Sequence, residues 1–321
     1  MANGGIIGPV QTVAVVSAVN RTTAFTANGN FTVQAGTKEV DYLMVAGGGG
    51  GSNAQCRAQG GGGGGGLTTS FPGGTKSIVN PRAVLAVVIG GGGSSGAASN
   101  SAGGTHNIGS NTTFNCLTAG GGGKGDGAAP LGSGGGGPSY GNGCGQPGGA
   151  QGNNGGNGNC NSNTPVAGSF TFVAGGGGGA GGAGGNGTNP GETVTSGAGG
   201  AVATNAITGS TVSYAGGGSG AAQAFPNNPK DVAIGSATPT SGLGQMFGGC
   251  AAGAGSANTG GGGGGGTSTN PTSPRTATGG AGGSGHVIIR EYANTLNEAP
   301  GVWNINEVYD NVKAGTWSNT N

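Results

Sequence analysis

The chain contains 321 residues, and its 88 glycines are about four times the usual share of roughly 7%. Charged residues make up only 6% of it and the formal net charge is +1, which gives no electrostatic basis for binding nucleic acid or an acidic membrane. So little charge, together with 5% aromatic residues, is also atypical of an enzyme core.

Residues 1–34 form the first predicted element, a β-rich attachment segment. In QTVAVVSAVNRTTAFTANGNFTV, β-branched and small polar residues alternate, and Asn28-Gly29 is typical of a hairpin turn. No basic residue precedes Arg21, so the segment lacks the charged start of a signal peptide, and the apolar stretch Val13–Val19 is too short to span a bilayer. We therefore expect no membrane insertion, and release by cell lysis.

Residues 35–292 are predicted to form one glycine-rich domain in which short apolar strands alternate with glycine tracts. The strands are rich in β-branched and aromatic residues, as in VDYLMVA at 40–46 and GHVIIREY at 285–292. The longest tracts lie at 47–51, 60–66, 90–93, 120–123, 134–137, 175–179 and 260–266.

Three interpretations of the tracts are open. Flexible linkers would join folded domains, but the segments between the tracts are too short to be domains. Collagen needs glycine at every third position, a pattern that these contiguous tracts do not follow. Glycine helices of the polyproline-II type could pack side by side and satisfy one another's backbone groups, because no Cβ holds them apart. In such a bundle the scaffold positions include Gly47, Gly63, Gly121, Gly135, Gly177 and Gly263.

Residues 293–321 are predicted to be a helical docking segment with few glycines and both tryptophans of the chain. Asn304 and Glu307 have the spacing of a near capping box, and Gly315 can close a helix of about nine residues. So short a helix is not stable alone, so its apolar face must dock on its own chain or on a neighbouring subunit. The candidate assembly residues are Trp303, Ile305, Val308, Tyr309, Val312 and Trp317.

Residues that could support catalysis or hold a cofactor form no recognisable motif. GGGGKGDG at 120–127 resembles a phosphate-binding loop, but no Ser or Thr follows its lysine. His106 and His286 lie far apart, and no carboxylate pair or activated nucleophile accompanies them. The five cysteines lack the spacing of a zinc site, and Cys144 with Cys160 is the one pair close enough to suggest a disulfide-closed loop. We expect no enzymatic activity, no metal and no cofactor.

Candidate contact surfaces are the polar connections between the tracts, which are rich in Asn, Ser and Thr and hold scattered aromatic residues. Aromatic rings on loops of small residues are good binding anchors. They can equally cover the ends of the bundle, a role that we assign to Phe114 and Phe247. The candidate receptor or subunit contacts are Tyr140, Phe71, Tyr214 and Phe225.

The order of these features resembles the glycine-rich domain of bacteriophage tail-fibre and related virion proteins. The opening NFTVQAGTKEVDYLMVAGGGGG and the closing TATGGAGGSGHVIIREY match that pattern from about Asn30 to Tyr292. The arrangement is also similar to the host-recognition adhesins of T-even-type phages, in which polyglycine-II helices carry receptor-binding loops. The C-terminal APGVWNINEVYDNVKAGTW resembles a terminal motif of marine phage structural proteins.

The resemblance implies a non-enzymatic virion structural protein, a tail-fibre or receptor-binding adhesin component. It also implies contacts with further copies of the chain, as a trimer or filament, with other virion proteins and with a bacterial outer-surface receptor. Two alternatives are a self-assembling virion or extracellular filament or coat without receptor recognition, and a capsid decoration protein. The expected fold is mainly β and irregular, with short β-strands, a bundle of glycine-rich polyproline-II-type helices and one short C-terminal α-helix.

Overall fold

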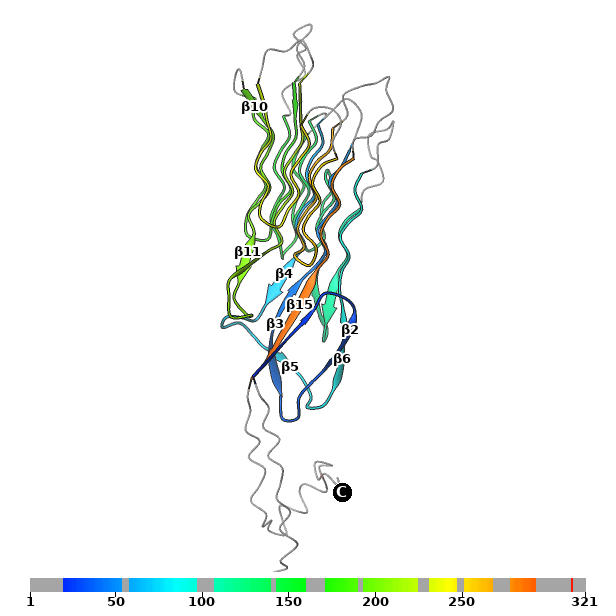
Figure 1. Cartoon of the computed structure of the whole chain (residues 1–321), viewed down its shortest axis with the longest axis vertical. Helices are drawn as coiled ribbons and strands as arrows, with labels where there is room; N and C mark the ends of the chain where they lie inside the picture. Colours follow the sequence, from blue (N-terminus) through cyan, green and yellow to red (C-terminus); the bar gives the residue numbers. More distant parts are fainter. Residues whose placement is uncertain are drawn as a thin grey trace, which may run out of the picture.

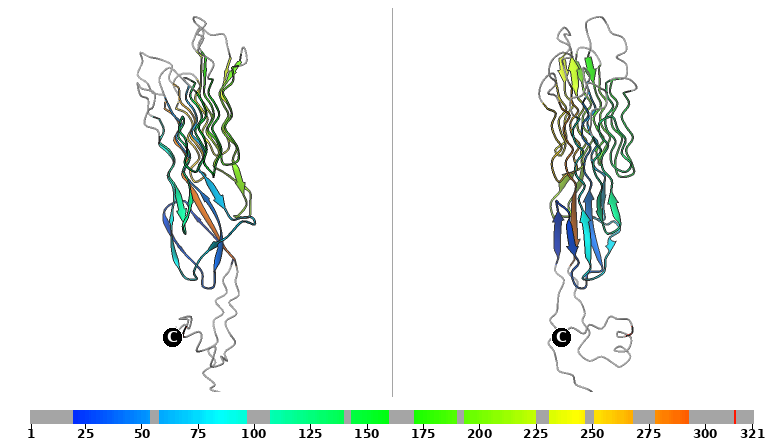
Figure 2. Two further views of the ribbon diagram at one scale, coloured as in Figure 1. Left: turned by 180° about the vertical axis from the view of Figure 1, so that it is seen from behind. Right: turned by 90° about the vertical axis from the view of Figure 1, so that its right-hand side faces the viewer.

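The computed structural model describes Lys313 and residues 20–53, 58–96, 107–139, 143–159, 171–189, 193–224, 231–246, 251–267 and 278–292. The glycine-rich domain is elongated: β-sheets form one end, and extended backbone segments run from them along the long axis (Figures 1 and 2). We call the sheet end the base, each extended segment a rod, and the opposite end, where β10 (Thr193–Thr195) lies, the far end.

Two antiparallel sheets form the base. The first has the strand order β1 (Arg21–Phe25), β15 (His286–Glu291), β3 (Glu39–Val45) and β4 (Leu67–Thr69), and β5 (Ser77–Ile78) also pairs with β3. The second has the order β2 (Gly29–Thr32), β6 (Val84–Val88), β7 (Thr112–Phe114) and β8 (Leu117–Ala119). Strand β15 therefore lies between two strands from the beginning of the domain and closes the first sheet.

Strand β3 is buried on both faces, which explains its nearly continuous apolar run. One face belongs to the core between the two sheets, a cluster that includes Val40, Tyr42, Met44, Phe31, Phe114 and Ile289. The other face packs in a second cluster, which includes Leu43, Val45, Ile207, Tyr214 and Ile288. The predicted strands at 40–46 and 285–292 thus form the centre of the base.

Three strand pairs flank the rods. Antiparallel pairs join β11 (Ala203–Asn205) to β12 (Val212–Tyr214), and β9 (Thr171–Val173) to β13 (Ala222–Ala224). A parallel pair joins β10 to β14 (Asp231–Ala233). The rods between the sheets and the far end are extended backbone outside any named strand.

The expected C-terminal α-helix is wrong as part of the fold class, because the elements that the described residues form are all β-strands. Helical spacing and a capping residue are local signals, and about nine residues make a marginal helix without tertiary packing. The residues proposed for its apolar face lie outside the described residues: Trp303, Ile305, Val308, Tyr309, Val312 and Trp317. The mainly β and irregular remainder of the expectation agrees with the structure.

The described part of the predicted 1–34 attachment segment belongs to the base. Strand β1 pairs with β15, and β2 pairs with β6. Phe31 of β2 is 2% exposed in the core between the sheets.

Candidate functional site: the glycine bundle and its two ends

The rod at 60–66 shows how the glycine tracts hold together. Its N–H groups donate to three neighbouring rods in turn, at N···O distances of 2.7 to 3.3 Å. The pairs are Gly61 to Gly175, Gly62 to Gly263, Gly63 to Gly123, Gly64 to Gly178, Gly65 to Gly260, and Gly66 to Gly120. The same neighbour therefore returns at every third residue, which is the period of a polyproline-II helix.

The carbonyl groups of this rod are bonded to three further rods. The donors are Ser52 to Gly60, Gly136 to Gly61, Gly218 to Gly62, Gly49 to Gly63, Ser133 to Gly64, and Ala46 to Gly66. The rod thus has six neighbours, and the described residues show no hydrogen bond between its own members. This lateral bonding is what the polyproline-II interpretation of the tracts requires, and it excludes flexible linkers for the described tracts.

Close packing of the backbones explains why these positions are glycine. At each of the six predicted scaffold glycines, a Cβ would lie within 3.0 Å of a carbonyl oxygen on another rod, a separation that real Cβ atoms essentially never show. For Gly63 that oxygen belongs to Ser133, and for Gly177 it belongs to Gly62. The other four are Gly47, Gly121, Gly135 and Gly263. Any side chain here would force backbone apart and break lateral hydrogen bonds.

Polar side chains replace the missing backbone acceptor where a rod lacks a neighbour. Gln151 Oε1 accepts from the N–H of Gly120 at 2.8 Å, and Asn111 Oδ1 accepts from Gly121 at 3.0 Å. Glycine N–H groups are accepted in the same way by Thr112, Asn154, Asn157, Ser196, Ser219 and Thr240. The expected place of such residues is in connections available for binding, but some of these Asn, Ser and Thr side chains complete the hydrogen bonding of the bundle. The sequence feature that could have indicated this role is an Asn, Gln, Ser or Thr close to a glycine tract.

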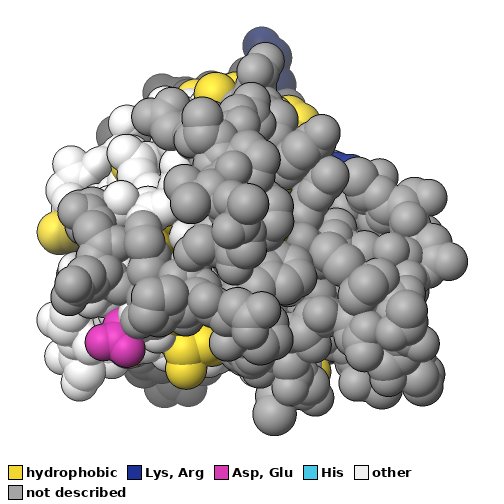
Figure 3. Space-filling view, turned by 90° about the horizontal axis from the view of Figure 1, so that it is seen from above, with side chains coloured by type: hydrophobic (Ala, Val, Ile, Leu, Met, Phe, Trp, Pro, Cys, Tyr) yellow, Lys and Arg dark blue, Asp and Glu magenta, His cyan; other side chains and the backbone are white. Residues whose placement is uncertain are grey.

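The coloured rods stop at the far end (Figure 1). In the sequence, the stretches between successive described ranges lie outside the described residues, and we call them the far-end segments: 54–57, 97–106, 140–142, 160–170, 190–192, 225–230, 247–250 and 268–277. Seen from this end, the described residues show mostly backbone and uncharged side chains, with hydrophobic and acidic side chains among them (Figure 3). Just below it lies a buried polar layer, in which Thr267 donates its N–H to Gln245 and its hydroxyl to Gln223.

Of the four predicted contact residues, the structure describes Tyr214 and Phe71, and it brings both into the second core cluster. Tyr140 and Phe225 lie outside the described residues, within two of the far-end segments. Tyr214 is only 3% exposed in the second core cluster, and burial raises the pKa of its hydroxyl. Phe71 is half-buried at the base, with the guanidinium of Arg290 5.6 Å from its ring centroid.

The residues proposed as plugs also need a correction. Phe114 is 1% exposed and lies in the core between the two sheets of the base, with its ring centroid 6.0 Å from that of Phe31. It therefore packs inside the base instead of covering the end of a rod, because it belongs to β7, which pairs with β6. Phe247 lies outside the described residues.

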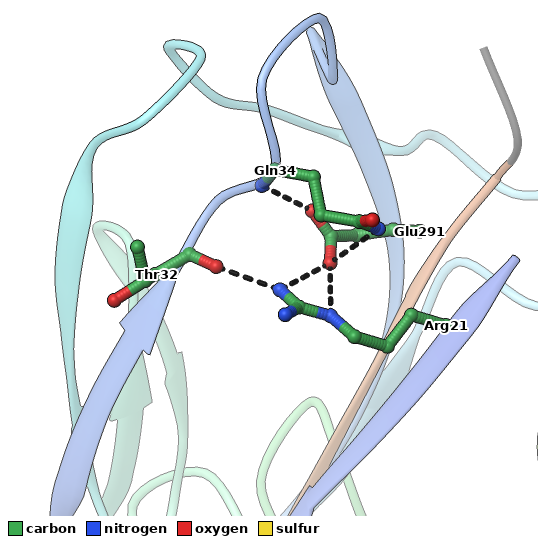
Figure 4. A network of polar contacts seen from close by, with 4 residues as sticks. All are labelled: Arg21, Thr32, Gln34 and Glu291. Carbon is green, nitrogen blue, oxygen red and sulfur yellow. Dashed lines mark hydrogen bonds and ion pairs between the residues drawn. The ribbon is translucent and has the colours of Figure 1, made fainter. Parts of the chain in front are cut away.

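A polar network joins the two ends of the domain at the base (Figure 4). Glu291 is fully buried and accepts from Arg21 Nε at 2.7 Å, and from the backbone N–H and the side-chain amide of Gln34 at 2.8 and 3.1 Å. Arg21 also donates to the carbonyl of Thr32 at 2.7 Å. Both oxygens of the carboxylate thus accept hydrogen bonds, as a buried charge requires.

Tyr292, the residue after β15, is fixed by a second set of contacts. Its hydroxyl donates to Asp41, which also accepts from Ser70 at 2.6 Å. The cationic groups of Lys76 and Arg290 lie 4.9 and 5.2 Å from its ring centroid. Desolvation and, after it, the hydrogen bond to Asp41 raise the pKa of the Tyr292 hydroxyl. The chain therefore leaves the domain from an anchored residue.

His286 begins β15 at the junction of base and rods. Its ring centroid is 6.3 Å from that of Tyr214, and its Nε2 is buried without a hydrogen-bond partner. Desolvation lowers the pKa of this imidazole, against a smaller opposing effect of a hydrogen bond with the Asn258 backbone. His106 lies outside the described residues.

The cysteines and acidic residues give no evidence of a metal site within the described part of the chain, where no group of three or more potential ligands gathers. Cys116 and Cys144 are free and exposed. Cys56, Cys160 and Cys250 lie outside the described residues, so the suggested pairing of Cys144 with Cys160 stays a prediction. No helix among the described residues is long and apolar enough to cross a membrane.

Comparison with known proteins gives one family. A family model described as a glycine-rich domain matches residues 23–292, which include all described rods and both sheets except Arg21 and Thr22 of β1. No curated protein matches the chain.

Proposed function

The chain belongs to the glycine-rich domain family, and we propose that it is a non-enzymatic virion structural protein, a tail-fibre or receptor-binding adhesin component of a bacteriophage. In this role the bundle is a stiff scaffold that holds the far-end segments toward the host surface. The base and the terminal segments attach the domain to further copies or to other virion proteins.

The observation that carries the proposal is the six-neighbour bonding of the rod at 60–66. A rod bonded on all sides cannot bend independently, so all rods move as one body. Every described rod runs between the base and the far end, and both ends of the domain meet at the base (Figure 1). Attachment and presentation are therefore separated along the long axis, as a fibre or tip protein needs.

Scarcity of charge along the bundle supports the same role. Among the described residues, the rods between base and far end carry Lys124 and Asp126, and Asp231 lies at the far end. Most other described charges belong to the base, including Arg21, Glu39, Asp41, Lys76, Arg290 and Glu291. Tightly bonded backbone with few lysines and arginines offers few sites to trypsin-like proteases.

A filament or coat without receptor recognition is the second candidate, and the outer rods favour it. The N–H groups of Ala254 and Ala281 donate to no acceptor among the described residues, although their rods are bonded on the inner side. An unpaired row of backbone donors is a template for association with another chain. Copies that pair through these rods would form a polymer.

The experiment combines electron microscopy of the purified full-length protein with adsorption of labelled protein to a panel of bacterial cells. The proposal expects discrete particles or short rods and saturable adsorption that excess unlabelled protein displaces. Replacing 225–230 at the far end by a Gly/Ser segment should weaken adsorption. The matched control replaces the exposed base turn 208–210 in the same way. Long regular filaments without adsorption to any cell would support the filament instead.

A further inference from the structure

Two of the exposed large hydrophobic side chains of the base share the outer face of β6. Val84 is 62% exposed and Val88 is 43% exposed. Side chains alternate along β6, so Val84, Ala86 and Val88 share its outer face, while Val87 is buried in the core. An apolar face of this kind on a chain with so few apolar side chains indicates a covered surface.

A cavity of about 410 Å³ continues this face. It is lined by Leu85 and Ala86 of β6 and by Thr113–Thr118 of the β7–β8 hairpin, and no charged residue lines it. It opens where β6 and β7 separate, since these strands pair only at Val87 and Val88. We call this cavity together with Val84 the β6 groove.

The groove is held in shape by the two-residue turn of the hairpin. Asn115 and Cys116 both have positive φ, 43° and 62°, between the paired residues Phe114 and Leu117. The amide of Asn115 donates to the hydroxyl of Ser77 and to the carbonyl of Ile78, both at 2.8 Å. These bonds fix β5 against the rim, so the groove is formed without any occupant.

We propose that the β6 groove binds the C-terminal segment of the same chain, through the apolar residues between Trp303 and Trp317. The last anchored residue before that segment, Tyr292, stacks with Lys76, which directly precedes β5 at the rim. Trp303 follows Tyr292 by eleven residues, a reach of at most about 40 Å. The segment therefore starts beside the groove with enough chain to enter it.

The apolar residues of the C-terminal segment suit the uncharged lining of the groove. Residues 303–317 contain two tryptophans, one tyrosine, one isoleucine and two valines within fifteen positions, in a chain with 5% aromatic residues. An uncharged groove lined by Leu85, Ala86 and Leu117 gains most from burying such side chains. This docking site is independent of whether the far end binds a receptor.

The native cysteines allow a direct test. Cys116 lines the groove, whereas Cys144 is an exposed free thiol outside its lining and serves as the internal control. Deleting residues 298–321 should make Cys116 react with a bulky maleimide at least about five-fold faster, the change expected when a site occupied by roughly 1 kcal/mol of binding becomes free. The rate at Cys144, measured by peptide mapping, should not change. Equal rates at Cys116 in the full-length and shortened chains would overturn the proposal.

Tryptophan fluorescence is the second readout, because Trp303 and Trp317 are the only tryptophans of the chain. Ala86→Asp in the groove should shift their emission to longer wavelength and increase quenching by acrylamide. Leu243→Asp, on a rod and 49% exposed, is the matched control and should leave both unchanged. Emission typical of exposed tryptophan in the unmodified protein would contradict docking. A shift that disappears on dilution would place the segment on a second copy and overturn docking within one chain.

Discussion

Arg21, the first residue of β1, lies opposite Glu291, the last residue of β15, and its guanidinium forms an ion pair with that fully buried carboxylate at 2.5 Å. The two residues are 270 positions apart, so this pair joins the ends of the domain. Because the strands are antiparallel, the chain enters and leaves the domain at the same end of the first sheet. A domain connected in this way can be carried by either terminal segment.

Glu291→Gln should destabilise the domain by about 2 kcal/mol, because the change removes the charge that Arg21 and Gln34 are arranged to bind. The side chain of Arg21 is 41% exposed, so water compensates part of the loss. Urea unfolding followed by circular dichroism gives the free energy. The matched control is Glu39→Gln, which breaks the exposed pair with Lys76 and should cost less than about 1 kcal/mol. Equal losses would mean that the buried pair is no stronger than the surface pair.

Gly63→Ala should prevent folding or cost more than about 3 kcal/mol, since even a methyl group would clash with the carbonyl of Ser133 on an adjacent rod. Backbone on both sides is fixed by hydrogen bonds and cannot move away. Soluble yield and the melting temperature are the measurements.

Gly91→Ala is the matched control, because a Cβ at Gly91 would meet no atom within 4 Å and its N–H donates to no acceptor among the described residues. This variant should melt within a few degrees of the unmodified protein. If Gly63→Ala behaves like Gly91→Ala, the rods are not packed backbone to backbone.

Gln151→Ala should cost about 1 to 3 kcal/mol, because Gln151 bonds both the N–H of Gly120 and the carbonyl of Thr118, each at 2.8 Å. Gln151→Glu keeps the acceptor for Gly120 but sets a carboxylate oxygen against the carbonyl of Thr118, so at neutral pH it should cost at least as much as Gln151→Ala. Thermal unfolding of the two variants separates these contributions. An unchanged melting temperature for Gln151→Ala would contradict the replacement role of the side chain.

His286 should make the domain less stable in mild acid. Its pKa is lowered in the folded state, so between that pKa and the unfolded value near about 6.5 the unfolded chain binds more protons. The stability associated with neutral His286 is therefore complete above about pH 6.5 and declines as the pH falls through that value. Melting temperatures at pH 7.5 and 5.5 should differ less in His286→Gln than in the unmodified protein. The same difference in both proteins would show that other groups cause the acid effect.

The sequence was sufficient to predict the two central strands of the base, and it offered backbone-to-backbone packing as one of three interpretations of the tracts. Strand β3 is marked by a run of residues that suit a doubly buried strand, and a contiguous glycine tract is sterically suited to backbone-to-backbone contact. These signals are local or follow from residue size. The six scaffold glycines are predictable for that reason.

The partners of each rod were not predictable. Glycine tracts carry no side chains that distinguish one neighbour from another, so nothing in the sequence says that Gly63 bonds to Gly123. The burial of Tyr214 follows from that arrangement, because Ile207 and Ile288 reach it only once the rods and β15 are in place. The Arg21–Glu291 ion pair was also not predictable, because the two residues are 270 positions apart in the sequence.

The most direct measurement of the central claim is amide hydrogen exchange across the full-length protein, read at the tract 60–66 and at β3. Ordered rods bonded on all sides predict that Gly61–Gly66 exchange as slowly as Val40–Val45, through opening of the whole domain. Exchange of the tract at the rate of an unfolded peptide, with β3 still protected, would show that the glycines are flexible linkers and contradict the account.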